Sequence, residues 1–155
     1  MQMHQLDARL RRMLQTLQGL RVRVARPVEN ITIAHRDSQD FVPFVNGSEW
    51  GTDRDHDWMD FKFTVVTPED YRGKVTVSIV TGREGMWEAT NPQFVVWVNG
   101  RIEQSFDTRH TSLTLENEAV PGKKYEIFLQ GYANVVPPNH GSHSNLPPRL
   151  GVYVN

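Results

Sequence analysis

The sequence predicts one all-β domain of the sandwich or jelly-roll class, preceded by a single amphipathic α-helix. Roughly seven or eight short runs of alternating apolar and polar residues follow one another after residue 26, with Gly, Pro and Asn between them. Only the first 25 residues depart from this period of two. A chain of 155 residues fits one domain, so we expect a helical segment at 1–25 and a β-sandwich at 26–155.

The first segment carries its apolar side chains at three- and four-residue steps, which places them on one face of a helix. They are Leu6, Leu10, Met13, Leu14, Leu17 and Leu20. An isolated helix of this length is marginal in water, so the leucine face needs a surface to pack on. Two partners remain open: the helix's own sandwich, or a neighbouring domain or subunit, which includes a homo-oligomer.

The strands are expected where apolar residues alternate with polar ones. In the run 58–66, Phe61, Phe63 and Val65 point to one side of the strand, and Lys62 and Thr64 to the other. The expected strands cover 30–35, 58–66, 74–80, 94–98, 101–103, 112–115, 125–132 and 150–154.

Turn residues separate these runs. Asn99 and Gly100 stand between two strand-like segments and predict a tight hairpin, because both residues tolerate a positive φ. The stretch 136–148 contains four prolines and predicts a long irregular loop before the last strand.

Charge and composition exclude several classes of partner. The formal net charge is -1, from 17 basic and 18 acidic residues, which gives no electrostatic footprint for nucleic acid or for an anionic membrane. No segment is long and apolar enough to cross a membrane, and the N-terminus lacks the apolar core of a signal peptide. There are no cysteines. We therefore expect a cytoplasmic protein with no nucleic-acid or membrane partner.

Metal binding is disfavoured by the residue pattern. Asp53, Asp55 and Asp57 alternate as at the start of a calcium loop, but the sixth and twelfth places hold Trp58 and Thr64 where an EF-hand needs Gly and Glu. An irregular calcium site on these three aspartates is a weak alternative to a plain acidic loop. His140 and His143 lie three apart in the proline-rich loop, but a metal site needs three or four ligands and no carboxylate lies nearby in the sequence. No nucleophile motif or phosphate loop is present, so we expect neither a metal nor a catalytic residue.

The four tryptophans are the remaining candidates for function, because exposed aromatic rings stack on sugars whereas buried ones fill a core. Trp87 lies in a loop-like stretch and is the best candidate for a surface role. For Trp50, Trp58 and Trp97 we expect core positions, with the opposite face of the strand as an alternative for Trp97, which alternates with Val96 and Val98.

An ordered set of segments resembles the N-terminal accessory domain of glycoside hydrolase family 38 α-mannosidases. It consists of 84–100 (EGMWEATNPQFVVWVNG), 106–110 (FDTRH), the upstream Trp50-Gly51, and Trp58. The resemblance covers most of the chain and implies a galactose-binding-like β-sandwich that precedes a catalytic barrel.

The same resemblance implies that this chain is not an enzyme by itself. In that family the zinc ion and the aspartate nucleophile belong to the barrel, whose opening His-x-His-x-Asp-x-x-Trp segment has no counterpart here. The chain is then expected to have no cofactor of its own and to support the barrel, its active-site rim or oligomer contacts. Its partners would be the catalytic domain of a parent chain, another subunit, and glycans.

The alternative function is a stand-alone carbohydrate-binding module, while a free-standing metal-dependent enzyme is disfavoured. For either sugar-related role, the candidates for carbohydrate contact are Trp87, Glu88, Asn91, Asp107 and His110.

Overall fold

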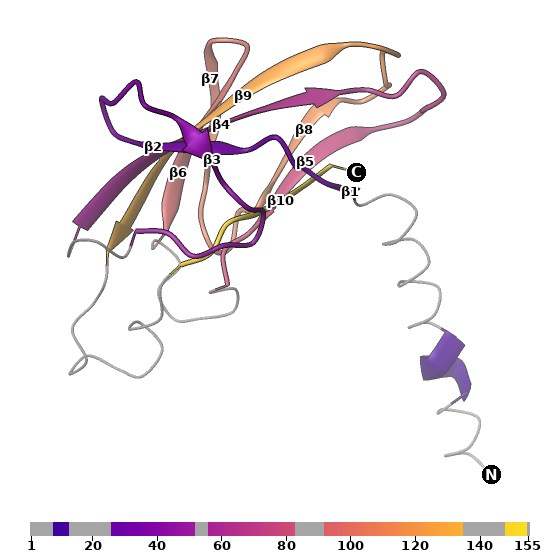
Figure 1. The fold of residues 1–155 in the computed structure, drawn as a ribbon. Helices are drawn as coiled ribbons and strands as arrows, with labels where there is room; N and C mark the ends of the chain where they lie inside the picture. Colours follow the sequence, from indigo (N-terminus) through magenta and orange to yellow (C-terminus); the bar gives the residue numbers. More distant parts are fainter. Residues whose placement is uncertain (1–7, 13–25, 52–55, 83–91, 135–147, 155) are drawn as a thin grey trace.

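The computed structural model describes residues 8–12, 26–51, 56–82, 92–134 and 148–154. The described part of the chain is built from two antiparallel β-sheets that lie face to face (Figure 1). The strands are β1 (Arg26–Pro27), β2 (Thr32–His35), β3 (Val42–Pro43), β4 (His56–Val66), β5 (Val75–Val80), β6 (Gln93–Val98), β7 (Arg101–Phe106), β8 (Ser112–Glu116), β9 (Lys124–Asn134) and β10 (Gly151–Val154). The predicted all-β sandwich is confirmed.

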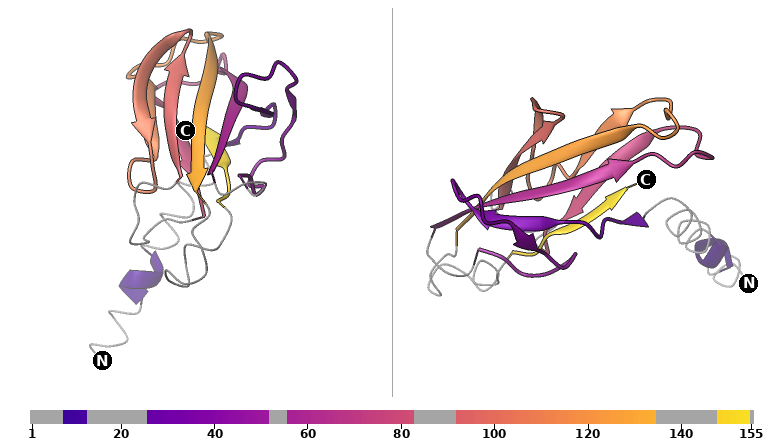
Figure 2. Two further views of the ribbon diagram at one scale, coloured as in Figure 1. Left: turned by 90° about the vertical axis from the view of Figure 1, so that its left-hand side faces the viewer. Right: turned by 45° about the horizontal axis from the view of Figure 1, so that its top comes forward.

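One sheet has four strands in the order β1-β10-β5-β8, and the other has six in the order β3-β2-β4-β9-β6-β7. The two longest strands, β4 and β9, pair along their whole length from His56 opposite Asn134 to Val66 opposite Lys124. They form the middle of the larger sheet, as Figure 2 shows from two sides. The described side chains of even number on both strands therefore share the face that points away from the smaller sheet.

The core lies between the sheets and is centred on aromatic side chains. Phe61 is fully buried, and its ring centroid lies 5.3 Å from that of Phe44, 5.2 Å from that of Trp50 and 6.0 Å from that of Phe94. These are edge-on contacts, the arrangement that the quadrupoles of aromatic rings favour. The alternating set predicted in β4 points into this core, as do Val77 and Ile79 of β5, and this fixes the register of both strands.

The hairpin between β6 and β7 forms where the sequence predicts it. Asn99 has φ 50° and Gly100 has φ 82°, so both central residues adopt the positive φ that a two-residue turn requires. Asn99 also pairs with β9: its N–H donates to the carbonyl of Glu126 at 2.9 Å, and its Oδ1 accepts from the Glu126 N–H at 2.8 Å. The turn therefore extends the sheet by one residue.

Three tryptophans were expected in the core, and the structure confirms this for one of them. Trp50 is buried, at 3% exposed. Trp58 is 44% exposed, and Trp97 is half-buried on the outward side of β6. The prediction fails for these two because each has the parity opposite to the buried residues of its own strand.

The structure contains two short strands that the sequence did not predict, and it describes only part of the predicted helix. β1 and β3 were not expected, since two-residue strands carry no measurable alternation. Of the predicted N-terminal helix, residues 8–12 are helical and all five are exposed, while the other residues of 1–25 lie outside the described part. Among the described residues, no helix is long and apolar enough to span a membrane.

Candidate carbohydrate-binding face

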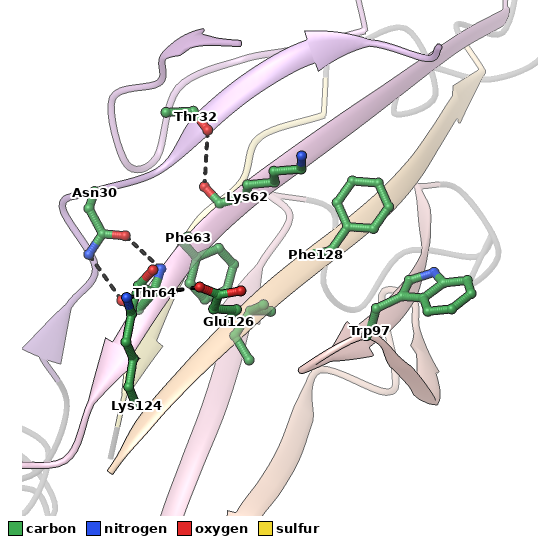
Figure 3. A pocket seen from close by; sticks show the side chains of 11 residues that line it. Asn30, Thr32, Lys62, Phe63, Thr64, Trp97, Lys124, Glu126 and Phe128 are labelled. Atoms are coloured by element: carbon green, nitrogen blue, oxygen red, sulfur yellow. Dashed lines mark hydrogen bonds and ion pairs between the residues drawn. The ribbon is translucent and has the colours of Figure 1, made fainter. Parts of the chain in front are cut away.

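The outward side of the six-stranded sheet is here called the outer face. It carries the described even-numbered side chains of β4 and β9 and the odd-numbered ones of β6. A groove of about 660 Å³ opens on it. The groove is lined by Asn30, Thr32, Lys62, Phe63, Thr64, Trp97, Gly100, Lys124, Glu126, Ile127 and Phe128 (Figure 3). Cross-strand pairing explains this grouping, because Lys62 stands opposite Phe128 and Thr64 opposite Glu126.

Two aromatic side chains form one end of the groove. Phe128 of β9 and Trp97 of β6 stand opposite each other in register, and both are half-buried (Figure 3). The Trp97 indole N–H donates a hydrogen bond to Oε1 of Gln130 at 2.8 Å, which fixes the ring orientation. The Lys62 ammonium lies 5.6 Å from the Phe128 ring centroid and 4.3 Å from that of Phe41, so the cation covers aromatic faces rather than filling the groove.

The opposite end of the groove is polar. There the Asn30 side chain hydrogen-bonds to the main chain of β4 as the main chain of a neighbouring strand would. Asn30 accepts a hydrogen bond from the Thr64 N–H at 2.7 Å and donates one to the Thr64 carbonyl at 3.0 Å. These bonds satisfy the main chain of β4 just beyond the end of its pairing with β2. Lys124 and Glu126 form a loose exposed ion pair at 3.9 Å beside them. The groove thus combines an aromatic end with hydrogen-bonding groups.

A second aromatic pair lies further along the same face. Trp58 stands opposite Tyr132 in register, with ring centroids 4.7 Å apart and planes at 48°. The guanidinium carbon of Arg36 lies 4.5 Å from the Trp58 ring centroid. Six residues separate Trp58 from Thr64 on β4, which is about 20 Å of strand. The outer face therefore has aromatic surfaces at two places along its length.

Between the groove and this second pair lies a buried carboxylate. Asp60 is 8% exposed and stands opposite Gln130 of β9 and Ala34 of β2. Burial raises the pKa of Asp60, and the nearby Asp37 carboxylate adds to the rise, while the positive charges of Arg36 and Lys62 oppose it. Asp60 is thus an acceptor held in an environment that disfavours its charged form.

The structure brings together two of the predicted contact residues, Asp107 and His110, in the turn after β7. Oδ1 of Asp107 accepts hydrogen bonds from the N–H groups of Arg109 at 2.8 Å and His110 at 2.7 Å, and His110 Nδ1 lies 3.1 Å away. Partial burial raises the pKa of Asp107, but these hydrogen bonds outweigh it and the net shift is downward. Asp107 therefore stabilises this turn. Sugar contact by Asp107 and His110 stays a prediction.

The other predicted site residues are not placed by the structure. Trp87, Glu88 and Asn91 lie outside the described residues, as do Asp53 and Asp55 of the weak calcium candidate. Asp57 belongs to β4, but its side chain is not described. Among the residues that are described, no three His, Asp or Glu side chains gather into a group that would hold a metal ion.

The residues that make up the outer face were not singled out from the sequence, although a signal for them exists. In the run 58–66 the core residues are Phe61, Phe63 and Val65. Trp58 and Asp60 have the opposite parity and so had to lie on the outer face with Lys62. What the sequence lacks is the pairing of β4 with β9 and β6, which brings three separate segments into one surface.

No protein-family model and no curated protein match this sequence. Solved structures do match: a family 35 carbohydrate-binding module from Clostridium thermocellum has 13% identity and a TM-score of 0.43, over 84% of this chain and 96% of that one. Faecalibacterium prausnitzii β-glucuronidase has 12% identity and a TM-score of 0.44, over 85% of this chain but only 32% of the longer enzyme. Likeness at this level does not carry a ligand or an activity from one protein to another.

Proposed function

We propose that this chain is a non-catalytic carbohydrate-binding domain that binds glycans on its outer face. The observation that carries the proposal is the exposure of aromatic rings along one face: Trp58 with Tyr132, and Trp97 with Phe128. Aromatic rings offer flat apolar surfaces on which the C–H faces of sugar rings pack, and they need a binding partner to be removed from water.

The polar groups of the groove supply the second half of such a site. Sugar hydroxyls both donate and accept hydrogen bonds. Lys62 offers a donor next to the aromatic end, and Thr64 and Glu126 offer a hydroxyl and an acceptor at the polar end. A mainly apolar pocket with a few placed polar groups is the usual composition of a small-ligand site.

The spacing of Asp60 and Glu126, the acidic residues described on the outward side of β4 and β9, favours binding over hydrolysis. Glycosidases hold two carboxyl groups about 5–10 Å apart. On the outer face Asp60 stands opposite Gln130, and Glu126 lies four residues from Gln130 along β9, which is about 13 Å of strand. This pair is too widely spaced for that chemistry.

The proposal is tested by isothermal titration calorimetry of the chain against mannose-, galactose- and glucose-based tetrasaccharides. We expect at least one to bind, and Trp58→Ala and Trp97→Ala each to weaken binding about tenfold or more, a loss of about 1.4 kcal/mol. Tyr153→Ala, an aromatic change on the four-stranded sheet, is the matched control and should bind as the wild type does. No binding to any of the glycans, or unchanged binding by both tryptophan variants, would overturn the proposal.

A second candidate is the accessory domain of a zinc-dependent family 38 α-mannosidase, which rests on the sequence resemblance. The matching hairpin β6–β7 and the turn 106–110 lie within the described residues. In that case the outer face or the leucine-bearing helix would contact a catalytic domain. A reading frame that continues beyond Asn155 into a His-x-His-x-Asp-x-x-Trp segment would support this candidate, and hydrolysis of a nitrophenyl mannoside by the present chain alone would contradict it.

A further inference from the structure

Asp60 is the least expected residue of the outer face. Its side chain shares the outward parity of Trp58 and Lys62, yet it is only 8% exposed. Within the described part of the chain, no group donates a hydrogen bond to its carboxylate, and Arg36 and Lys62 act on it only through their charge. Both cations lie over rings instead, Arg36 over Trp58 and Lys62 over Phe41.

A carboxylate with so little exposure lowers the stability of the folded protein. A carboxylate with this little exposure loses most of its hydration, and among the described residues only the charges of Arg36 and Lys62 compensate for that loss. Poorly solvated carboxylates without a hydrogen-bond donor are rare in folded proteins, and functional sites are one of the places where such groups persist. The neighbour of Asp60 on β2 is Ala34, whose side chain offers no hydrogen-bond donor to the carboxylate.

The neighbouring amide complements this acceptor. Gln130 stands directly opposite Asp60, and its Oε1 is occupied by the Trp97 indole N–H at 2.8 Å. Its Nε2 group is then the end of the amide left to donate. A donor and an acceptor that stand side by side match adjacent hydroxyl groups of a sugar, since each hydroxyl both donates and accepts.

The position of Asp60 also indicates the size and the charge of the ligand. It lies between the Trp58–Tyr132 pair and the groove, on a face about 20 Å long from Trp58 to Thr64. A ligand that reaches both aromatic surfaces must be an oligosaccharide that passes over Asp60. A uronic acid at that point would bring a second carboxylate beside a desolvated one, and like charges at low dielectric repel strongly.

We infer that Asp60 is the specificity-determining residue of this face, where its carboxylate accepts hydrogen bonds from adjacent hydroxyls of a neutral oligosaccharide lying along β4 and β9. Gln130 donates beside it, and the two aromatic surfaces hold the sugar rings on either side. This inference rests on the proposed function, and it adds the ligand class and the residue that selects it.

The test is calorimetry of the wild type and Asp60→Asn against neutral tetrasaccharides (mannotetraose, galactotetraose and cellotetraose) and against tetragalacturonate. Asn keeps the shape of Asp but removes the charge and one acceptor. We expect the wild type to bind a neutral tetrasaccharide at least tenfold more tightly than tetragalacturonate, and Asp60→Asn to bind that neutral ligand at least tenfold more weakly. Glu118→Gln, an exposed change that removes one carboxylate outside the outer face, is the matched control.

Thermal unfolding of each variant separates loss of the site from loss of the fold, because Asp60→Asn should not lower the melting temperature. If the wild type binds a neutral glycan and Asp60→Asn binds it equally well, the role of Asp60 is wrong and the proposed function stands. Preference of the wild type for tetragalacturonate would also overturn the inference. If the wild type binds no glycan, the proposed function itself fails.

Discussion

The side-chain amide of Asn46 pairs with the main chain of Val152 as a residue of a neighbouring strand would. Its Nδ2 donates to the Val152 carbonyl at 2.8 Å, and its Oδ1 accepts from the Val152 N–H at 3.0 Å. The same Nδ2 group donates to the carbonyl of Val28 at 2.8 Å. Asn46 therefore connects Val152 of β10, 106 positions away in the sequence, to Val28, the residue that follows β1.

Asn46→Ala is expected to destabilise the sandwich by about 2–4 kcal/mol, because it removes three hydrogen bonds and leaves partly buried main-chain groups unpaired. Urea unfolding followed by tryptophan fluorescence measures this loss. Asn117→Ala, at an exposed position, is the control and should change the free energy of unfolding by less than about 0.5 kcal/mol. Equal stability of the two variants would show that the Asn46 bonds contribute nothing net.

Gly131→Ala should destabilise the core even though it adds only a methyl group. A Cβ at this position would lie 3.0 Å from the Phe94 ring, 3.0 Å from the Trp50 ring and 3.1 Å from the Met59 carbonyl oxygen. These atoms are packed in the core or in the main chain, so we expect a loss of about 1–3 kcal/mol. Denaturant unfolding measures it beside Ser112→Ala, an exposed strand position. An unchanged denaturation midpoint would mean that the surrounding core residues accommodate the added methyl group without loss of stability.

Asp60→Asn should stabilise the folded protein at neutral pH. The folded state raises the pKa of Asp60 above its ordinary value of 3.8, so the folded chain holds this proton more tightly than the unfolded chain does. The free energy of unfolding of the wild type therefore falls as the pH rises through the interval between these two pKa values. The Asn variant lacks this loss.

The difference in stability between Asp60→Asn and the wild type should be largest at neutral pH and shrink toward pH 3.8 and below. Urea unfolding at a series of pH values measures it. The charged groups that face Asp60 are Arg36 and Asp37 after β2 and Lys62 on β4, while β9 contributes the neutral Gln130. A variant that is less stable than the wild type at neutral pH would show that these cations outweigh burial.

Removal of residues 1–25 should leave the stability of the sandwich unchanged within about 0.5 kcal/mol. The described helical residues 8–12 are all exposed, and Leu10 is 50% exposed. Thermal unfolding of the full and shortened chains measures the effect, and size-exclusion chromatography shows whether the helix mediates contacts between copies. A loss of 2 kcal/mol or more would instead mean that the leucine face packs on its own domain.

The sequence by itself determined the fold class and most of the strands. Alternation in β4 and β5 placed Phe61 and Val77 in the core, because a strand that is buried on one side must repeat its apolar residues every second position. The Asn99-Gly100 turn was also determined locally, since φ preferences act within two residues.

Only the tertiary structure decided which strands are neighbours and therefore what the outer face contains. Alternation assigns a side chain to one of two faces, but it does not say whether that face meets the other sheet or a ligand. Trp58 was expected in the core on hydrophobicity alone, and its parity together with the β4–β9 pairing put it beside Tyr132 on the surface. Asp60 meets Gln130 for the same reason: partners 70 residues apart are joined by hydrogen-bond register, which no local pattern encodes.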